Sequence, residues 1–387
     1  MPFPAVIAGR TRYVFIDLFR STVIFLMLEG HVARTLLSAS LQQTSLFQLH
    51  EFVHGLTAPA FLFAAGLTFV ISTRHTWQAY HHPSLRLARR AGRILLILGL
   101  GLFLHLPFFS LRKILREGSL PEMLQLFQCD VLACIGIGLA LLHFILYFMK
   151  SERRFHRAVA VLAGVIVLGT PIVWEIDVLN FAPVPVAQLL NGKHGSPFPL
   201  FPYLGFLLVG VLVSKGFIDA SVRGQAEAFR RRMLLLGAGL LVAGIILDAV
   251  PVHIYPVYDF WFTSPDYFLI RAGLLMAAFS GFMALSARLP AQPRVLTVLG
   301  RESLFVYILH LLIIYGSSVN PRANLQAVLG GSSGVALAAA VFVGLTVSML
   351  FSASLWNYLR RERPWMFRLV QIAAGVLFIY RFLANPW

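Results

Sequence analysis

The sequence has few charged residues and very little cysteine. Of its 387 residues, 12% are charged and 58% are hydrophobic. Soluble domains carry about 25% charged residues, so this composition indicates a polytopic membrane protein. The two cysteines, Cys129 and Cys134, lie five positions apart in one apolar segment, where a helix would point them away from each other. They predict neither a mutual disulfide nor a metal centre, and no metal is expected.

Acidic residues are scarcer than basic ones, 16 against 32, which gives a net charge of +16. Such an excess can indicate binding to nucleic acid. Here, however, the basic residues gather in short clusters between apolar segments, which is typical of cytoplasmic loops of membrane proteins. The lipid bilayer, and no nucleic acid, is therefore the expected partner.

Long apolar runs are the dominant feature of the sequence. A helix of roughly 20 apolar residues crosses a hydrocarbon core of about 30 Å. We predict an all-α, polytopic transmembrane helix bundle of about eleven spans that forms one domain over residues 1–387. The predicted spans lie near 13–37, 52–73, 94–110, 125–149, 158–176, 199–217, 233–252, 267–286, 296–316, 334–357 and 366–383.

The basic clusters also predict an orientation. Each even-numbered span is followed by a segment rich in Lys and Arg, such as Arg360, Arg361 and Arg363 after the tenth. Since short cytoplasmic loops carry this excess, the N-terminus is predicted to be cytoplasmic. The exception is residues 111–124, which are basic although they fall on the predicted outer side.

The first span carries an unusual set of polar residues: Asp17, Arg20, Glu29 and His31. A charge at mid-bilayer costs roughly 2.5–3.5 kcal/mol on insertion scales, so such residues usually face a protein interior or a wet cavity. Arg20 and His31 share one helix face and are separated by a rise of about 16 Å. This face would present a cation toward the cytoplasm and an imidazole toward the outer surface.

Histidines gather in the predicted outer half of the protein. His is the side chain best suited to proton transfer near neutral pH, so this asymmetry predicts a site that opens outward. Asp130 falls in the same half, where a buried carboxylate needs a partner. The histidines concerned are His31, His50, His54, His105 and His310.

Several strings resemble known acyltransferases. Residues 16–20 (Ile-Asp-Leu-Phe-Arg) followed by His31 resemble the first span of membrane-bound acyltransferases. Residues 54–66 are similar to the second-span signature of the heparan-alpha-glucosaminide N-acetyltransferase catalytic-domain family, in its bacterial branch. Residues 127–136, and residues 202–206 with Gly210, fit the same family, and residues 299–310 are similar to a late span of the broader acyltransferase group.

The resemblance implies a membrane-bound acyltransferase that moves an acyl group, usually acetyl, from cytoplasmic acetyl-CoA to a sugar or amino sugar on the outer face. It implies a catalytic histidine, for which two positions compete. His31 matches the first-span histidine of the wider group, whereas His50 matches the lysosomal branch, with His54 in place of an asparagine. The expected location is the bacterial inner membrane.

The chemistry expected of these residues is general-base catalysis. An imidazole would remove a proton from the acceptor as it attacks the thioester, and direct transfer and an acetyl-histidine intermediate both stay open. Arg20, with Asp17, would hold the phosphates of CoA, although an ion pair between the two is the alternative. Glu29, Asp130 and His310 are expected to line the site; for Asp130 a helix-locking role is open.

A transporter or flippase is the main rival function, with the buried charges as a proton relay. It explains the many spans but not the ordered acyltransferase-like strings. The acceptor, the choice between O- and N-acylation and the existence of a homo-oligomer are left open by the sequence.

Overall fold

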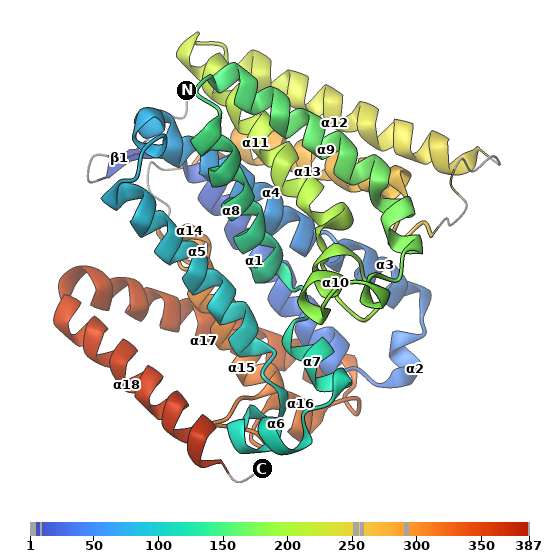
Figure 1. The fold of residues 1–387 in the computed structure, drawn as a ribbon, viewed down its shortest axis with the longest axis vertical. Helices are drawn as coiled ribbons and strands as arrows, with labels where there is room; N and C mark the ends of the chain where they lie inside the picture. Colours follow the sequence, from blue (N-terminus) through green and yellow to red (C-terminus); the bar gives the residue numbers. More distant parts are fainter. Residues whose placement is uncertain (1–4, 8–9, 251–254, 256–258, 290–293, 386–387) are drawn as a thin grey trace. The chain divides into compact units, whose positions relative to one another are not determined.

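The computed structural model describes residues 5–7, 10–250, 255, 259–289 and 294–385 (Figure 1). Apart from two three-residue strands that pair antiparallel, β1 (Ala5–Ile7) and β2 (Arg10–Arg12), the regular elements of this part of the chain are helices. The predicted all-α fold is confirmed. The chain divides into two compact units. The first unit is built from Ala58–His105 and Met123–Ala284. The second unit is built from Pro2–Thr57, Leu106–Glu122 and Leu285–Trp387.

The first unit is a bundle of long helices. Within it α9 packs along α11, and α5 packs along α8. Glycines allow the close approaches: a Cβ on Gly66 of α4 would lie 2.0 Å from the backbone oxygen of Leu207 in α11. Apart from a few terminal residues, its elements are α4 (Thr57–Thr73), η1 (Arg74–Tyr80), α5 (Leu85–Leu104), α7 (Leu120–Leu126), α8 (Val131–Phe148), α9 (Glu152–Glu175), η3 (Val178–Asn180), α10 (Val184–Leu190), α11 (Leu200–Val222), α12 (Ala226–Ala249) and α13 (Pro265–Ser286).

The second unit is built around the first long helix, α1, which packs against α14, α15 and α17. At Gly300 of α14 an added Cβ would lie 2.2 Å from the backbone oxygen of Asp17, so the two helices touch through their backbones. The elements of this unit are β1, β2, α1 (Val14–Leu36), α2 (Ala39–Gln42), α3 (Ser45–His54), η2 (Pro107–Phe109), α6 (Leu111–Glu117), α14 (Arg294–Arg301), α15 (Ser303–Tyr315), α16 (Leu325–Leu329), α17 (Val335–Glu362) and α18 (Pro364–Ala384).

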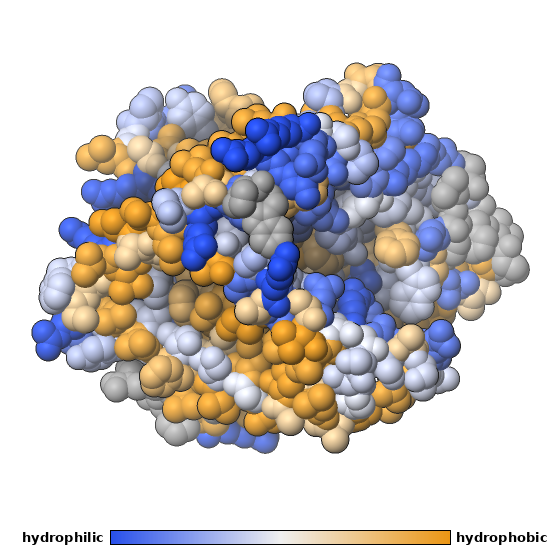
Figure 2. Space-filling model, turned by 90° about the horizontal axis from the view of Figure 1, so that it is seen from below, coloured by the Kyte–Doolittle hydropathy of each residue, from blue (hydrophilic) through white to orange (hydrophobic). Residues whose placement is uncertain are grey.

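The helices have the length and surface of membrane spans. Eight helical stretches of the described chain are long and apolar enough to cross a bilayer. Large apolar side chains are exposed on them, for example Val347 on α17 at 60% and Ile372 on α18 at 63%. Figure 2 shows such hydrophobic residues in broad patches on one face of the molecule. Because an exposed apolar surface of this extent needs a lipid environment, the protein is an integral membrane protein.

Two predicted spans differ most from the helices observed. The span expected at 94–110 is α5, which begins earlier, at Leu85. Ser84 caps this helix, because its hydroxyl accepts a hydrogen bond from the Leu87 N–H at 3.2 Å. The helix ends shortly before Pro107. Four arginines therefore lie inside this helix rather than in a loop. The span expected at 296–316 is divided into α14 and α15 at Glu302. Neither α1 nor α5, both of which carry several charges, is among these eight stretches.

Candidate functional site

Helix α1 places His31 near its C-terminal end, in the second unit. The Nδ1 atom of His31 lies 2.9 Å from the Tyr315 hydroxyl at the end of α15. The Thr35 hydroxyl, one helical turn after His31, donates to the same phenolic oxygen at 3.3 Å. In the part of the chain that the structure describes, only one of the two ring nitrogens of His31 has a hydrogen-bond partner.

Two further imidazoles surround His31. The ring centroid of His54, at the end of α3, lies 5.6 Å away, and that of His310, in α15, lies 5.2 Å away. The approach of His54 depends on Gly30, since a Cβ at that position would lie 1.8 Å from Nδ1 of His54. His31, His54, His310 and Tyr315 are called the histidine cluster below.

His310 has a defined tautomer. Its Nδ1 donates to the Val306 carbonyl oxygen at 2.8 Å, and a carbonyl can only accept, so this nitrogen carries the proton. The side chain is fully buried, and Nε2 has no hydrogen-bond partner among the described residues. In the neutral ring this Nε2 holds a lone pair, which leaves an unused proton acceptor inside the cluster.

His50 lies beside the cluster and is held by carboxylates. Its Nε2 is 2.7 Å from Glu29 on α1, and its Nδ1 is 3.7 Å from Glu51. Glu51 also forms an ion pair with Arg34, one turn beyond His31 on α1. The structure thus brings together His31, His50, His54, His310 and Glu29 of the predicted site residues.

The predicted CoA-binding residues lie at the opposite end of α1. The Arg20 guanidinium donates to the Ser303 hydroxyl, and Asp17 lies 3.8 Å from Nε of Arg301. Their partners on α14 and α15 were not among the predicted site residues. This polar group continues to Glu302, which accepts hydrogen bonds from α17. A charged site at this end of the unit is compatible with phosphate binding, because guanidinium groups recognise phosphate oxygens.

Asp130 belongs to the first unit and has a structural role there. It caps α8, since its Oδ1 accepts from the Ala133 N–H at 2.7 Å. Its Oδ2 lies 3.6 Å from Nε2 of His105, the residue that ends α5. This arrangement favours the helix-locking alternative for Asp130, while its place in a substrate site stays a prediction.

Tyr315, Arg34 and Glu51 are the neighbours of the cluster that sequence reasoning missed. Arg34 lies three residues after His31, and Glu51 lies three residues before His54, so spacing along the helices could have suggested both. Tyr315 is separated from His31 by 284 residues, and no local pattern indicates their contact.

Together, the fold and the cluster define a polytopic helical membrane protein with several imidazoles gathered at one end of its first long helix. Residues 12–244 match the family model described as "Heparan-alpha-glucosaminide N-acetyltransferase, catalytic". The match covers about three fifths of the chain, and the protein belongs to this family of membrane acyltransferases. His310 and Tyr315 lie outside the matched residues. A comparison with curated proteins found no match.

Proposed function

We propose that this protein transfers an acetyl group from cytoplasmic acetyl-CoA to a hydroxyl or amino group of a sugar on the outer face of a bacterial inner membrane, with His31 as the general base. The family supports the acyl transfer. The observation that carries the assignment of the base is the position of His31 at the centre of the histidine cluster, within ring contact of His54, His310 and Tyr315.

The contact with Tyr315 allows either tautomer of His31, and the proposed reaction uses the one with the proton on Nδ1. Tyr315 Oη accepts from Thr35, and it can accept a second hydrogen bond from Nδ1–H of His31. In that arrangement Nε2 of His31 holds the lone pair and can take a proton from the acceptor. His50 is given a lesser role, since its Nε2 is held by Glu29 at 2.7 Å and its ring lies beside the histidine cluster rather than at its centre.

The proposed reaction proceeds by direct transfer. As Nε2 of His31 removes the proton, the oxygen or nitrogen of the acceptor forms a bond to the thioester carbonyl carbon. The carbon–sulfur bond then breaks, and the leaving thiolate takes the proton from the imidazolium to give free CoA. The Tyr315 hydroxyl keeps the imidazole of His31 oriented through the cycle. The nearby Nε2 of His310 accepts a hydrogen bond from the substrate.

The donor would run along α1. Arg20 and its neighbours would hold the phosphates of CoA, and the helix rise of about 16 Å from Arg20 to His31 is comparable with the reach of a pantetheine arm. This arrangement allows the acyl group to reach an acceptor on the other side of the membrane without movement of the nucleotide across it.

The test of this reaction is the release of free thiol from acetyl-CoA by the purified wild-type protein with a panel of sugars and amino sugars. We expect thiol release that depends on one class of acceptor, together with a product heavier by one acetyl group. If acetyl-CoA neither binds nor turns over with any acceptor, while solute flux is measured in proteoliposomes, the protein is a transporter and the proposal is wrong.

A further inference from the structure

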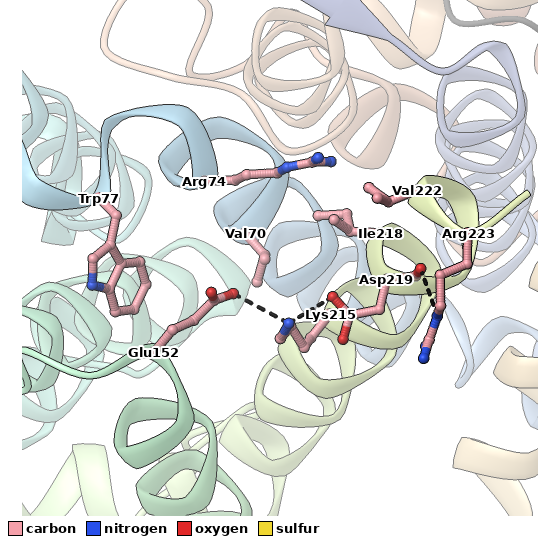
Figure 3. Close-up of a pocket in the computed structure, with 9 residues that line it drawn as sticks. All are labelled: Val70, Arg74, Trp77, Glu152, Lys215, Ile218, Asp219, Val222 and Arg223. Atoms are coloured by element: carbon pink, nitrogen blue, oxygen red, sulfur yellow. Dashed lines mark hydrogen bonds and ion pairs between the residues drawn. The ribbon is translucent and has the colours of Figure 1, made fainter.

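A cationic groove lies in the first unit, at the end where α4 and α11 stop and α9 starts. A cavity of about 440 Å³ is lined there by Arg74, Trp77, Glu152, Lys215 and Arg223, among others (Figure 3). A neighbouring hollow of about 640 Å³ shares Glu152 and Lys215 and continues along the first turns of α9. The two hollows form one groove, named the α9 groove below.

The acidic residues of the α9 groove are already occupied. Lys215 lies between two carboxylates, 3.4 Å from Glu152 and 2.6 Å from Asp219 (Figure 3). The lysine offsets one of these two carboxylates, so the three residues together carry a net charge of −1 and do not themselves attract an anion.

Four arginines of the α9 groove have no carboxylate partner in the part of the chain that the structure describes. Arg223 donates from Nε only to the backbone oxygen of Asp219, at 3.2 Å, and none of the other three forms an ion pair. The α9 groove therefore holds five cations against two carboxylates, and its surplus positive charge resides on guanidinium groups. These arginines are Arg74 and Arg223 in the first hollow and Arg153 and Arg157 in the second.

The floor of the α9 groove is apolar. Val70 and Ile218 are buried beneath Arg74, and Val222 lies beside them (Figure 3). Trp77 stands at one side, and Trp is the residue typical of a membrane–water interface. The groove thus places the Arg74 guanidinium above an apolar surface and Arg223 at its other end, at the basic ends of helices that the charge distribution assigns to the cytoplasmic leaflet.

We infer that the α9 groove binds the head group of an anionic phospholipid, with Arg74 and Arg223 on the phosphate and an acyl chain along the apolar floor. Basic pockets between membrane helices on the cytoplasmic side are suited to acidic head groups, because the phosphate charge is met away from bulk water. A soluble phosphate compound would bind to the arginines but would make no apolar contact with the floor of the groove. This site is independent of the proposed acetyl transfer, since it lies outside the histidine cluster.

The test uses the full-length protein in a neutral detergent, titrated with short-chain phosphatidylglycerol or phosphatidylcholine and followed by native mass spectrometry. We expect wild-type protein to retain phosphatidylglycerol at least tenfold more strongly than phosphatidylcholine. The double substitution Arg74→Gln and Arg223→Gln should remove this preference. The matched control, Arg361→Gln with Arg363→Gln, changes two exposed arginines outside the α9 groove and should retain it.

Two results would overturn the inference. One is an unchanged preference in the Arg74→Gln and Arg223→Gln protein. The other is equal competition by glycerol phosphate or CoA, which would assign the α9 groove to soluble phosphates. If the double variant does not fold, the single substitution Arg223→Glu at an exposed position provides the same comparison.

Discussion

Gly30→Ala tests whether the position of His54 matters for catalysis. An alanine Cβ would lie 1.8 Å from Nδ1 of His54, whereas nonbonded carbon contacts settle near 3.5–4.0 Å, so the ring must move by roughly 2 Å. That nitrogen has no hydrogen-bond partner among the described residues, but the ring also bonds to the Leu26 backbone, and this hydrogen bond would be strained as the ring moves. A misplacement of about 1 Å can cost about 100-fold in rate, and we expect a loss of at least tenfold in thiol release.

The expected effect of Gly30→Ala on stability is small. Alanine is favoured over glycine in a helix by about 1 kcal/mol, which offsets part of the roughly 1–3 kcal/mol that overpacking costs. Thermal unfolding should therefore shift by a few degrees at most. The matched control is Gly344→Ala on α17, where no atom lies within 4 Å of the new methyl group and activity should be unchanged.

A double-mutant cycle separates the contact from other effects. In a His54→Ala background the space beside Gly30 is open, so Gly30→Ala should cost almost nothing further in activity. Full activity in the single Gly30→Ala variant, or an equal loss in both backgrounds, would refute the reasoning.

Three further changes have distinct expected outcomes. Tyr315→Phe removes the hydrogen bond to His31 and should lower the turnover number about tenfold without a change in melting temperature; an unchanged rate would exclude the orienting role. Gly300→Ala places a methyl group against the backbone of α1, which cannot turn aside, and should destabilise the protein by about 1–3 kcal/mol in thermal unfolding, whereas unaltered stability would contradict the packing. A hydrogen bond from His194 lowers the pKa of Asp177, outside the membrane spans. The wild-type protein should therefore be more stable than Asp177→Asn above pH ~4, and this advantage should vanish as the pH falls through the lowered pKa of Asp177. A difference in melting temperature that is the same at pH 7 and pH 3 would disprove this role of Asp177.

Much of the fold was predictable because the membrane imposes a simple rule. A run of about 20 apolar residues has to be helical to satisfy its backbone in lipid, so the all-α bundle follows from hydropathy. Helix boundaries depend on local chemistry that hydropathy averages out. Ser84 starts α5 well before its apolar part, and Glu302 divides α14 from α15 inside one apolar run.

The candidate site was predictable in part. His31, Glu29 and Arg20 stand out because a polar residue in an apolar helix is costly and needs a reason. The partners of Arg20 and His31 come from α15, more than 270 residues away, and no periodicity in the sequence relates such positions. The role of Asp130 depends on the backbone geometry at the start of α8, which the sequence leaves open.

The most direct test of the central claim compares thiol release by His31→Ala, His50→Ala and the control His75→Ala, which changes an exposed histidine of η1. With the acceptor that supports wild-type turnover, we predict a loss of about 100-fold or more for His31→Ala, a smaller loss for His50→Ala and none for the control, with equal melting temperatures throughout. Wild-type turnover in His31→Ala, or loss of turnover in His50→Ala alone, would contradict the assignment of His31 as the base.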